Sequence, residues 1–428
     1  MSPLLFVVII LTFIVVISVI NERKIHLQQD IAVLLFSFLL CLAFLIIAKG
    51  FHIVNFENVV TKLSTFNFEN YLMDGVLCLM IFAGSSKINI KKFRQNFKTI
   101  TYLSLISTAI SSVLFGLLFY AVAHMFGLEI DIWVAIMLGC IVSPTDPIAA
   151  TGILNKLGIS KNVLSVIESE SLFNDGTGVA LFIFVRSIVT NSGESNFFLI
   201  MFKEIFGALL VGTVISLLLF QFIKRTNKPT MQVIISLLSV SSIYVICEHF
   251  GFSGVIGSVV CGMLFAYMMN KIERQREVYD SAHVYENFWE TVDSILNSML
   301  FVMIGISVIS ISPDKNLIVL LLIGVFALIL SRFVGVLSSA IVSRGKNVPG
   351  NYSVTEFSLL LTWTALKGGL SLALALGTKE FLSQDVYSIV LTTTYCIIMF
   401  SVLVQGLSIK PVYKYIEKQR IKRLGDKK

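Results

Sequence analysis

The chain alternates between long apolar stretches and short polar segments over almost its whole length. An apolar run of about 20 residues is long enough for an α-helix to cross the hydrocarbon core of a bilayer. The pattern therefore predicts an all-α polytopic membrane protein with about thirteen transmembrane helices. The predicted spans are residues 3–20, 31–49, 71–86, 99–127, 132–155, 162–190, 197–223, 230–249, 252–270, 289–311, 316–343, 355–376 and 385–409. Residues 1–409 would form the transmembrane domain, and residues 410–428 a basic tail.

Composition supports a membrane protein over a soluble enzyme. Hydrophobic residues make up 56% of the chain and charged residues 14%, whereas an ordinary soluble domain has roughly 45–50% and 25%. All six cysteines fall inside apolar stretches, where they are expected as small buried side chains. The chain has neither an H-E-x-x-H nor a G-x-S-x-G motif. We therefore expect no enzymatic activity and no cofactor.

The basic residues predict how the chain is oriented in the membrane. Most lie in the loops after odd-numbered spans and in the tail, and the loops after even-numbered spans hold only Lys49, Lys62, Lys315 and Lys379. Because cytoplasmic loops are enriched in Lys and Arg, the C-terminus is predicted inside the cell and the N-terminus outside. The net charge of +7 then requires no nucleic-acid partner, and the tail is expected near anionic lipid. The short tail and the absence of a transit peptide favour a bacterial plasma membrane.

Several ionisable side chains fall inside the predicted spans. A charge in hydrocarbon is costly, so such a side chain usually faces a partner or a water-filled cavity. Four of them lie near span ends, where they are expected to reach the headgroups: Arg186, Lys203, Glu204 and Asp293. Five lie near mid-span and are the main candidates for function: Asp146, Glu170, Asp175, Arg332 and Lys367.

The fifth span contains Ser143-Pro144-Thr145-Asp146-Pro147. Each proline removes a backbone donor and disfavours helix before it, so the span is predicted to be broken here. Irregular backbone at membrane depth is tolerated where it lines a cavity or is buried in protein. Freed carbonyls, the Thr145 hydroxyl and the Asp146 carboxylate would form an oxygen-rich niche for a cation. The alternative is a structural kink in which Asp146 caps the second half-helix.

The sixth span places polar side chains on two adjacent helical rows. Ser171 and Asp175 share one row, and Glu170 and Asn174 share the next. At least one of these acids must be paired, and we nominate Arg332 of the eleventh span as the partner of Glu170, which leaves Asp175 to exchange protons. The alternative is a hydrogen-bonded cluster with a purely structural role.

The twelfth span contains Lys367-Gly368-Gly369, and the paired glycines predict a second break. The two breaks would occupy corresponding positions if spans 4–6 and 11–13 were inverted repeats. Paired broken helices in inverted halves are typical of the substrate site of a secondary transporter. Lys367 is expected to neutralise the carbonyl ends of the half-helices.

These motifs resemble those of the monovalent cation:proton antiporters of the sodium/proton exchanger type. The resemblance is carried by the stretches Ser143–Gly152 and Glu168–Phe182, with support from Glu248–Gly262, Phe288–Gly305 and Trp363–Leu374. It implies crossed broken helices and a homodimer. It also implies that Asp175 binds the ion and the proton and that Asn174 is its structural neighbour. The resemblance assigns Thr145, Asp146 and Ser171 to the cation niche, and Glu170 and Arg332 to a stabilising ion pair.

The chain departs from the family pattern at two positions. Ala83 stands where many members carry an acid in the third span, and Lys367 stands where arginine is common. The expected activity is exchange of Na⁺, with Li⁺ as a further candidate, for H⁺ by alternating access. Asn174, which cannot titrate, favours an electroneutral 1:1 exchange. The missing acid at position 83 leaves K⁺/H⁺ exchange open as an alternative, and a cation channel is a more remote one.

Overall fold

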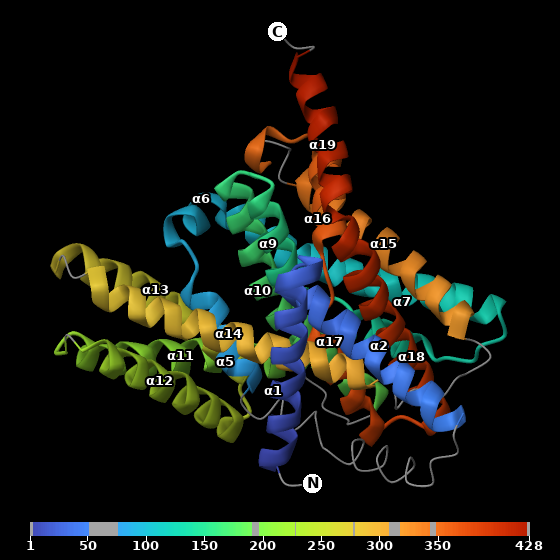
Figure 1. The fold of residues 1–428 in the computed structure, drawn as a ribbon, viewed down its shortest axis with the longest axis horizontal. Helices are drawn as coiled ribbons and strands as arrows, with labels where there is room; N and C mark the ends of the chain where they lie inside the picture. The colour runs from blue at the N-terminus through green and yellow to red at the C-terminus, as the bar shows by residue number, and fades with distance from the viewer. Residues whose placement is uncertain are drawn as a thin grey trace.

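The computed structural model describes residues 3–50, 76–190, 197–226, 228–276, 279–307, 317–342 and 348–425. Within these ranges the chain forms helices and no strand, which confirms the predicted all-α class (Figure 1). The helices of the first part are α1 Pro3–Ile20, α2 Gln29–Gly50, α5 Leu77–Ser86, α6 Ile90–Thr101, α7 Thr108–Met125, α8 Ile132–Ile141, α9 Ile148–Lys156 and α10 Lys161–Val189. Those of the second part are α11 Phe197–Ile223, α12 Pro229–Phe250, α13 Gly254–Arg276, α14 Tyr279–Ser307, α15 Leu317–Val342, α16 Val354–Thr364, α17 Gly369–Gly377, α18 Gln384–Phe400 and α19 Leu407–Gly425.

Length and hydropathy mark many of these helices as membrane spans. Among the described residues, eight helices are long and apolar enough to cross a bilayer, and the bent pair α16 and α17 would make a ninth. Shorter apolar helices include α8, and α5, whose predicted span begins at residues 71–75, outside the described residues. The number of thirteen crossings stays a prediction. So does the division at residue 409, which falls inside α19.

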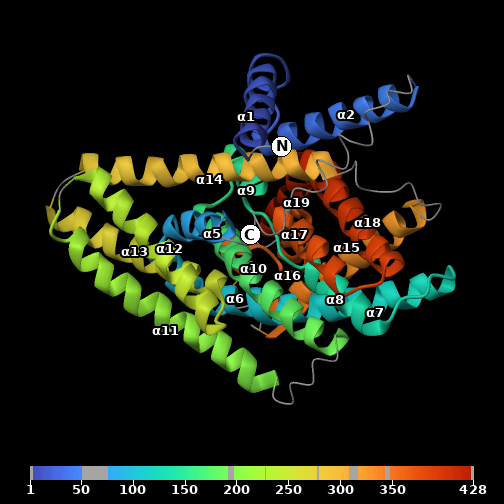
Figure 2. The ribbon, with the colours of Figure 1, turned by 90° about the horizontal axis from the view of Figure 1, so that it is seen from below.

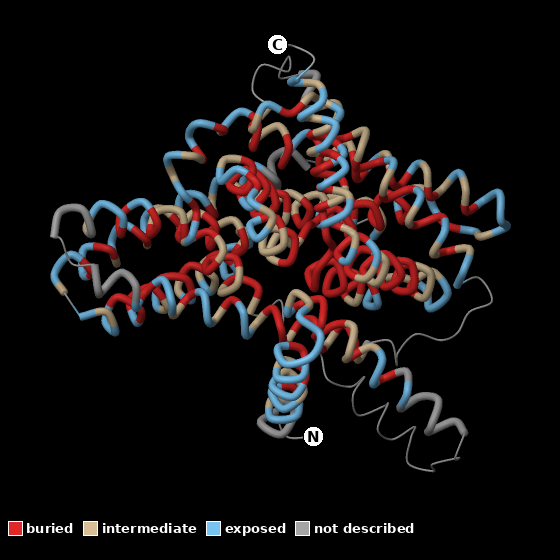
Figure 3. The backbone as a smooth tube through the Cα atoms, turned by 45° about the horizontal axis from the view of Figure 1, so that its top comes forward, coloured by how far each residue is buried: buried red, intermediate tan, exposed pale blue. Residues whose placement is uncertain are grey.

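The outer faces of the long helices are apolar. Leu210, Val245, Ile318 and Leu322 are all largely exposed, as expected where lipid rather than water surrounds the protein. Buried residues concentrate where the helices meet at the centre of the molecule (Figure 3). Hydrophobic side chains thus fill the core and also cover the outside of the helix bundle, which accounts for the high hydrophobic content of the chain.

Two groups of helices can be distinguished by their packing. In the first, which we call the wall group, α11, α12 and α13 pack on one another, and α13 and α14 pack on α5. In the second, the break group, α8 packs between α7 and α10, and α15 packs on α7, α16 and α18. Figure 2 shows α11, α12 and α13 on one side, α7, α15 and α18 on the other, and α14 along one face.

Two broken helices meet in the break group. The chain is not helical between the end of α8 and the start of α9, and again between α16 and α17, which are bent by 64°. The backbone N–H of Asp146, in the first break, donates a hydrogen bond of 2.7 Å to the carbonyl of Leu366, in the second. The breaks therefore touch, which confirms the predicted pair of crossing broken helices.

A glycine lets the first break approach α10. A Cβ atom on Gly178 would lie 2.8 Å from both Pro144 Cγ and Ser143 Oγ, closer than real Cβ contacts. The predicted proline break and the glycine of the sixth span therefore work together: the prolines unwind the chain and the glycine admits it against the helix.

Candidate ion-binding site

Thr145 joins the first break to α10. Its backbone N–H donates to both Asn174 Oδ1 and Asp175 Oδ1, at 3.2 Å each. Its hydroxyl lies 2.8 Å from the Ser171 hydroxyl, and Ser171 also donates to the Thr145 carbonyl. Proline removes the helical partners of this backbone, and side chains of α10 replace them. The structure thus brings together four of the residues selected from sequence.

Asp146 caps the second half-helix. Its Oδ1 accepts a hydrogen bond of 2.9 Å from the backbone N–H of Ile148, in the first turn of α9. The structural role considered for Asp146 is therefore present. Asp146 is nevertheless only half-buried, because it also lines a cavity, so capping and ion binding are compatible.

Glu170 and Arg332 form the ion pair nominated from sequence. Arg332 Nη2 and Glu170 Oε1 are 2.8 Å apart, and both side chains are buried. Asn174 Nδ2 donates to the same Glu170 oxygen at 3.0 Å and to the Thr145 hydroxyl at 2.9 Å. Asn174 is thus a fully buried bridge between the ion pair and the broken helix.

Lys367 binds backbone carbonyls of the first break, just beyond the end of α8. Its Nζ donates to the carbonyls of Ser143 and Pro144, at 3.1 and 3.2 Å. A cation is favourable beside the C-terminal end of a helix, where unpaired carbonyls carry partial negative charge. This is the contact expected from sequence, and it links the second break to the first.

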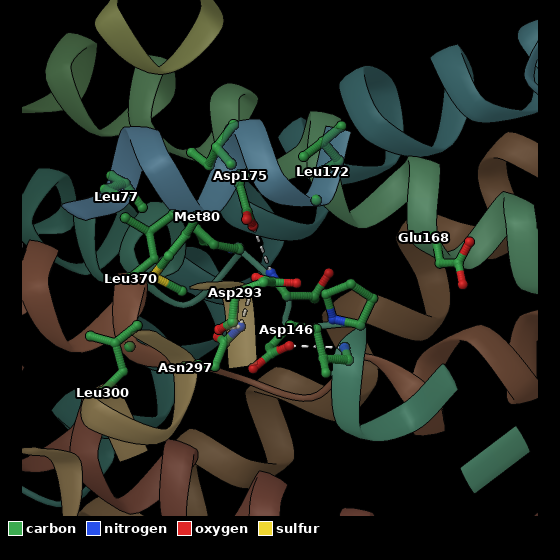
Figure 4. Close-up of a pocket in the computed structure, with 18 of the residues that line it drawn as sticks. Leu77, Met80, Asp146, Glu168, Leu172, Asp175, Asp293, Asn297, Leu300 and Leu370 are labelled. Atoms are coloured by element: carbon green, nitrogen blue, oxygen red, sulfur yellow. Dashed lines mark hydrogen bonds between the residues drawn. The ribbon is translucent and has the colours of Figure 1, made fainter. Parts of the chain in front are cut away.

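A cavity of about 410 Å³ lies against this cluster and between the two helix groups (Figure 4). Residues Pro144 to Ile148, Asp175 and Gly368 line it from the break group, and α5 and α14 line it from the wall group. Five carboxylates face it, against one ammonium, that of Lys87: Asp146, Glu168, Asp175, Glu290 and Asp293. A cavity with this balance concentrates cations.

The partners of the cluster differ in their access to the cavity. Thr145, Glu170, Ser171, Asn174, Arg332 and Lys367 are all buried. Asp146 and Asp175 are half-buried and line the cavity. In Figure 4 the Asp175 carboxylate points from α10 toward the backbone of the first break, and Glu168 lies apart. Asp146 and Asp175 are therefore the carboxylates of the cluster that an ion in the cavity can reach.

One charged residue does not lie where the sequence predicts it. Asp293 was expected to reach the headgroups from a span end, but its side chain is only 8% exposed and lines the cavity, 2.8 Å from Lys87 Nζ. The sequence holds a signal for this, because Glu290, Asp293 and Asn297 are spaced to share one face of α14. Ala83 lies in the core with Phe82 and Trp289 and is not among the cavity-lining residues.

The site offers oxygen ligands of several kinds. The described residues hold no group of three or more His, Cys, Asp and Glu side chains that could bind a metal ion together. Two carboxylates, two hydroxyls and the carbonyls of an unwound segment lie together instead. Hard monovalent cations are bound by such oxygen sets in transporters with broken helices.

Comparison with known proteins identifies the family. Residues 66–415 match the family described as "Sodium/hydrogen exchanger, transmembrane". The chain belongs to this family of exchangers. The Na⁺/H⁺ antiporter NhaP of Pseudomonas aeruginosa is 28% identical over 93% of each chain. The Na⁺/H⁺ antiporter NhaH of Halobacillus dabanensis is 33% identical over 74% of this chain and 76% of its own. The resemblance stated from the motifs is thereby confirmed.

Solved structures extend the likeness to the fold. The structure of the sodium proton antiporter MjNhaP1 from Methanocaldococcus jannaschii matches this exchanger with a TM-score of 0.75 at 18% identity, over 96% of this chain and 98% of that one. The fold class predicted from sequence is thus that of a known antiporter.

Proposed function

We propose that this exchanger moves Na⁺ and H⁺ in opposite directions by letting them compete for the carboxylate of Asp175. Membership of the sodium/hydrogen exchanger family and the Na⁺/H⁺ antiporters among its relatives support the exchange itself. The observation that supports this assignment is that Asp175 combines a place in the hydrogen-bonded cluster with access to the cavity.

The bound cation would take oxygens from Asp175, Asp146, Thr145 and Ser171. The neighbouring Glu170 keeps its charge balanced by Arg332 in both states, and Asn174 cannot titrate. One Na⁺ therefore replaces one H⁺ at a single carboxylate, and the exchange is electroneutral. Lys367 and Asn174 hold the first break in place through the carbonyls and hydroxyl that they contact.

Alternating access would come from movement of the break group against the wall group. The cavity lies between the two groups, so a shift of one against the other closes it on one side and opens it on the other. Lys87 and Glu168, at the exposed end of the cavity, belong to the side predicted to be cytoplasmic. The conformation is therefore assigned as open to the cytoplasm.

Several further features belong to the same proposal. The N-terminus lies outside a bacterial plasma membrane and the C-terminus inside, and the basic tail contacts anionic lipid. The exchanger works as a homodimer and has no enzymatic activity of its own.

Flux measurements test the proposal. Purified protein in proteoliposomes is expected to move protons when Na⁺ or Li⁺ is added, and Asp175→Asn is expected to abolish this flux while the protein stays folded. Asp385→Asn, the same change at an exposed position on α18, serves as the control and should leave flux unchanged. Full Na⁺-driven flux in Asp175→Asn would refute the assignment, and a response to K⁺ alone would establish K⁺/H⁺ exchange instead.

A further inference from the structure

Helix α14 carries three polar side chains and one apolar side chain in a row along the wall of the cavity. The row follows helical spacing and consists of Glu290, Asp293, Asn297 and Leu300. Glu290 is exposed, whereas Asp293, Asn297 and Leu300 are 5%, 4% and 5% exposed. The row therefore runs from the surface inward, and it ends where Leu300 packs close to Gly369 of the second break.

Asp293 is the acid in this row that lies inside the protein. Its Oδ2 lies 2.8 Å from Lys87 Nζ, and its Oδ1 accepts a hydrogen bond of 3.0 Å from Asn297 Nδ2. Asp293 and Asp146 line the same cavity, and Figure 4 shows both around it. A cation that moves along this wall thus meets Asp293 on its way to the site.

Lys87 differs from its partner in exposure. Its side chain is 41% exposed, against 8% for Asp293. A lysine with a flexible stem and an exposed ammonium can leave its partner, and its ammonium can move into water at little cost. A buried carboxylate left without a cation, in contrast, is strongly unfavourable. A cation beside the ionised Asp293 is therefore favourable, and Lys87 supplies one from the edge of the cavity.

We propose that Asp293 sets the apparent affinity of the exchanger for cytoplasmic Na⁺, and that the Lys87 ammonium is a tethered competitor for this carboxylate. An entering Na⁺ takes the place of the ammonium at Asp293 before it passes to Asp146 and Asp175. The wall group in this way contributes a carboxylate to the cation path, although position 83 of α5 carries none. This inference rests on the proposed Na⁺/H⁺ exchange.

The test compares KM and Vmax for Na⁺ in proteoliposomes, with Na⁺ added on the side that corresponds to the cytoplasm. Lys87→Met is expected to lower KM by about two- to fivefold, and Asp293→Asn to raise it by a similar factor. Vmax should change little in either variant. Lys87→Arg, which keeps the charge, should restore a KM close to that of the wild type.

Two controls separate competition from other effects. Lys91→Met removes the same charge from an exposed position four residues away, which does not line the cavity, and should leave KM unchanged. In the Asp293→Asn background, Lys87→Met should no longer lower KM, because the competitor has lost its carboxylate. All variants are first compared with the wild type by size-exclusion chromatography in detergent.

Three outcomes would overturn the inference: an unchanged KM in Lys87→Met, an equal effect of Lys91→Met, or a persistent effect of Lys87→Met in the Asp293→Asn background. These outcomes are distinct from a failure of the proposed function. If the wild type shows no Na⁺-driven flux, the proposed function fails. If it shows flux that Asp175→Asn abolishes, but the Lys87 series is flat, only the role of Lys87 and Asp293 fails.

Discussion

Glu170 and Arg332 carry opposite charges at the centre of the break group. The two side chains are 3% and 6% exposed and lie 2.8 Å apart. Removing one partner of a buried pair leaves a charge without compensation, which costs far more than the net contribution of the intact pair. The pair therefore holds α10 and α15 together beside the ion site. Its loss should be visible in stability as well as in transport.

We expect Arg332→Met to lower the free energy of unfolding by about 3–5 kcal/mol. Arg186→Met is the control, because Arg186 lies 3.8 Å from Glu380 with both side chains well exposed, and such a pair contributes about 1 kcal/mol or less. Thermal unfolding in detergent measures both variants. The double variant Glu170→Gln/Arg332→Met should recover much of the loss. Equal effects of Arg332→Met and Arg186→Met would contradict the structural role.

At the scale of helices, the two breaks are held in register by contacts between them and with α10. The Asp146 N–H donates to Leu366 O, Lys367 donates to a carbonyl of the first break, and the Thr145 N–H donates to Asn174. None of these contacts is made by a helix with itself. The breaks are therefore positioned by each other, and crowding at one point should disturb the whole cluster.

Alanine at position 178 tests this dependence. The new Cβ would lie 2.8 Å from Pro144 Cγ and Ser143 Oγ, so the first break would have to move from α10, at a cost of about 1–3 kcal/mol. We expect slower Na⁺-driven flux and a lower unfolding temperature. Gly176→Ala on the same helix meets its nearest atom at 3.6 Å, an ordinary contact, and should leave both properties unchanged. Equal behaviour of the two variants would show that the close approach does not matter.

Features that depend on local sequence signals could be predicted, whereas those that depend on packing between distant helices could not. Prolines, paired glycines and charges inside apolar runs act locally, so the breaks and the cluster around Asp175 were predictable. The partner of Glu170 followed because Arg332 stands alone in an apolar run and needs a carboxylate. The role of Asp293 was missed because it depends on α5 and α14 packing together, and residues 87 and 293 have no local relation. The cavity itself arises from packing between helix groups.

At the scale of the whole molecule, the basic residues are concentrated on one side and the thiols are buried. Basic residues gather on the side predicted to be cytoplasmic, and α19 carries many of them. The start of α1 and the end of α19 lie at opposite ends of the molecule (Figure 1). All six cysteines are buried, so a cysteine introduced at the surface should react with a maleimide well before the native ones.

This distribution makes the orientation measurable. Lys379 and Lys418 are both exposed, and they flank the predicted span 385–409, so they should lie on opposite sides of the membrane. A membrane-impermeant maleimide is expected to label Lys379→Cys in intact cells and Lys418→Cys only after permeabilisation, with the unsubstituted protein as the background control. The reversed result would invert the orientation and place the cavity of Asp146 and Asp175 on the outside. Labelling of both variants from the same side would mean that residues 385–409 do not cross the membrane.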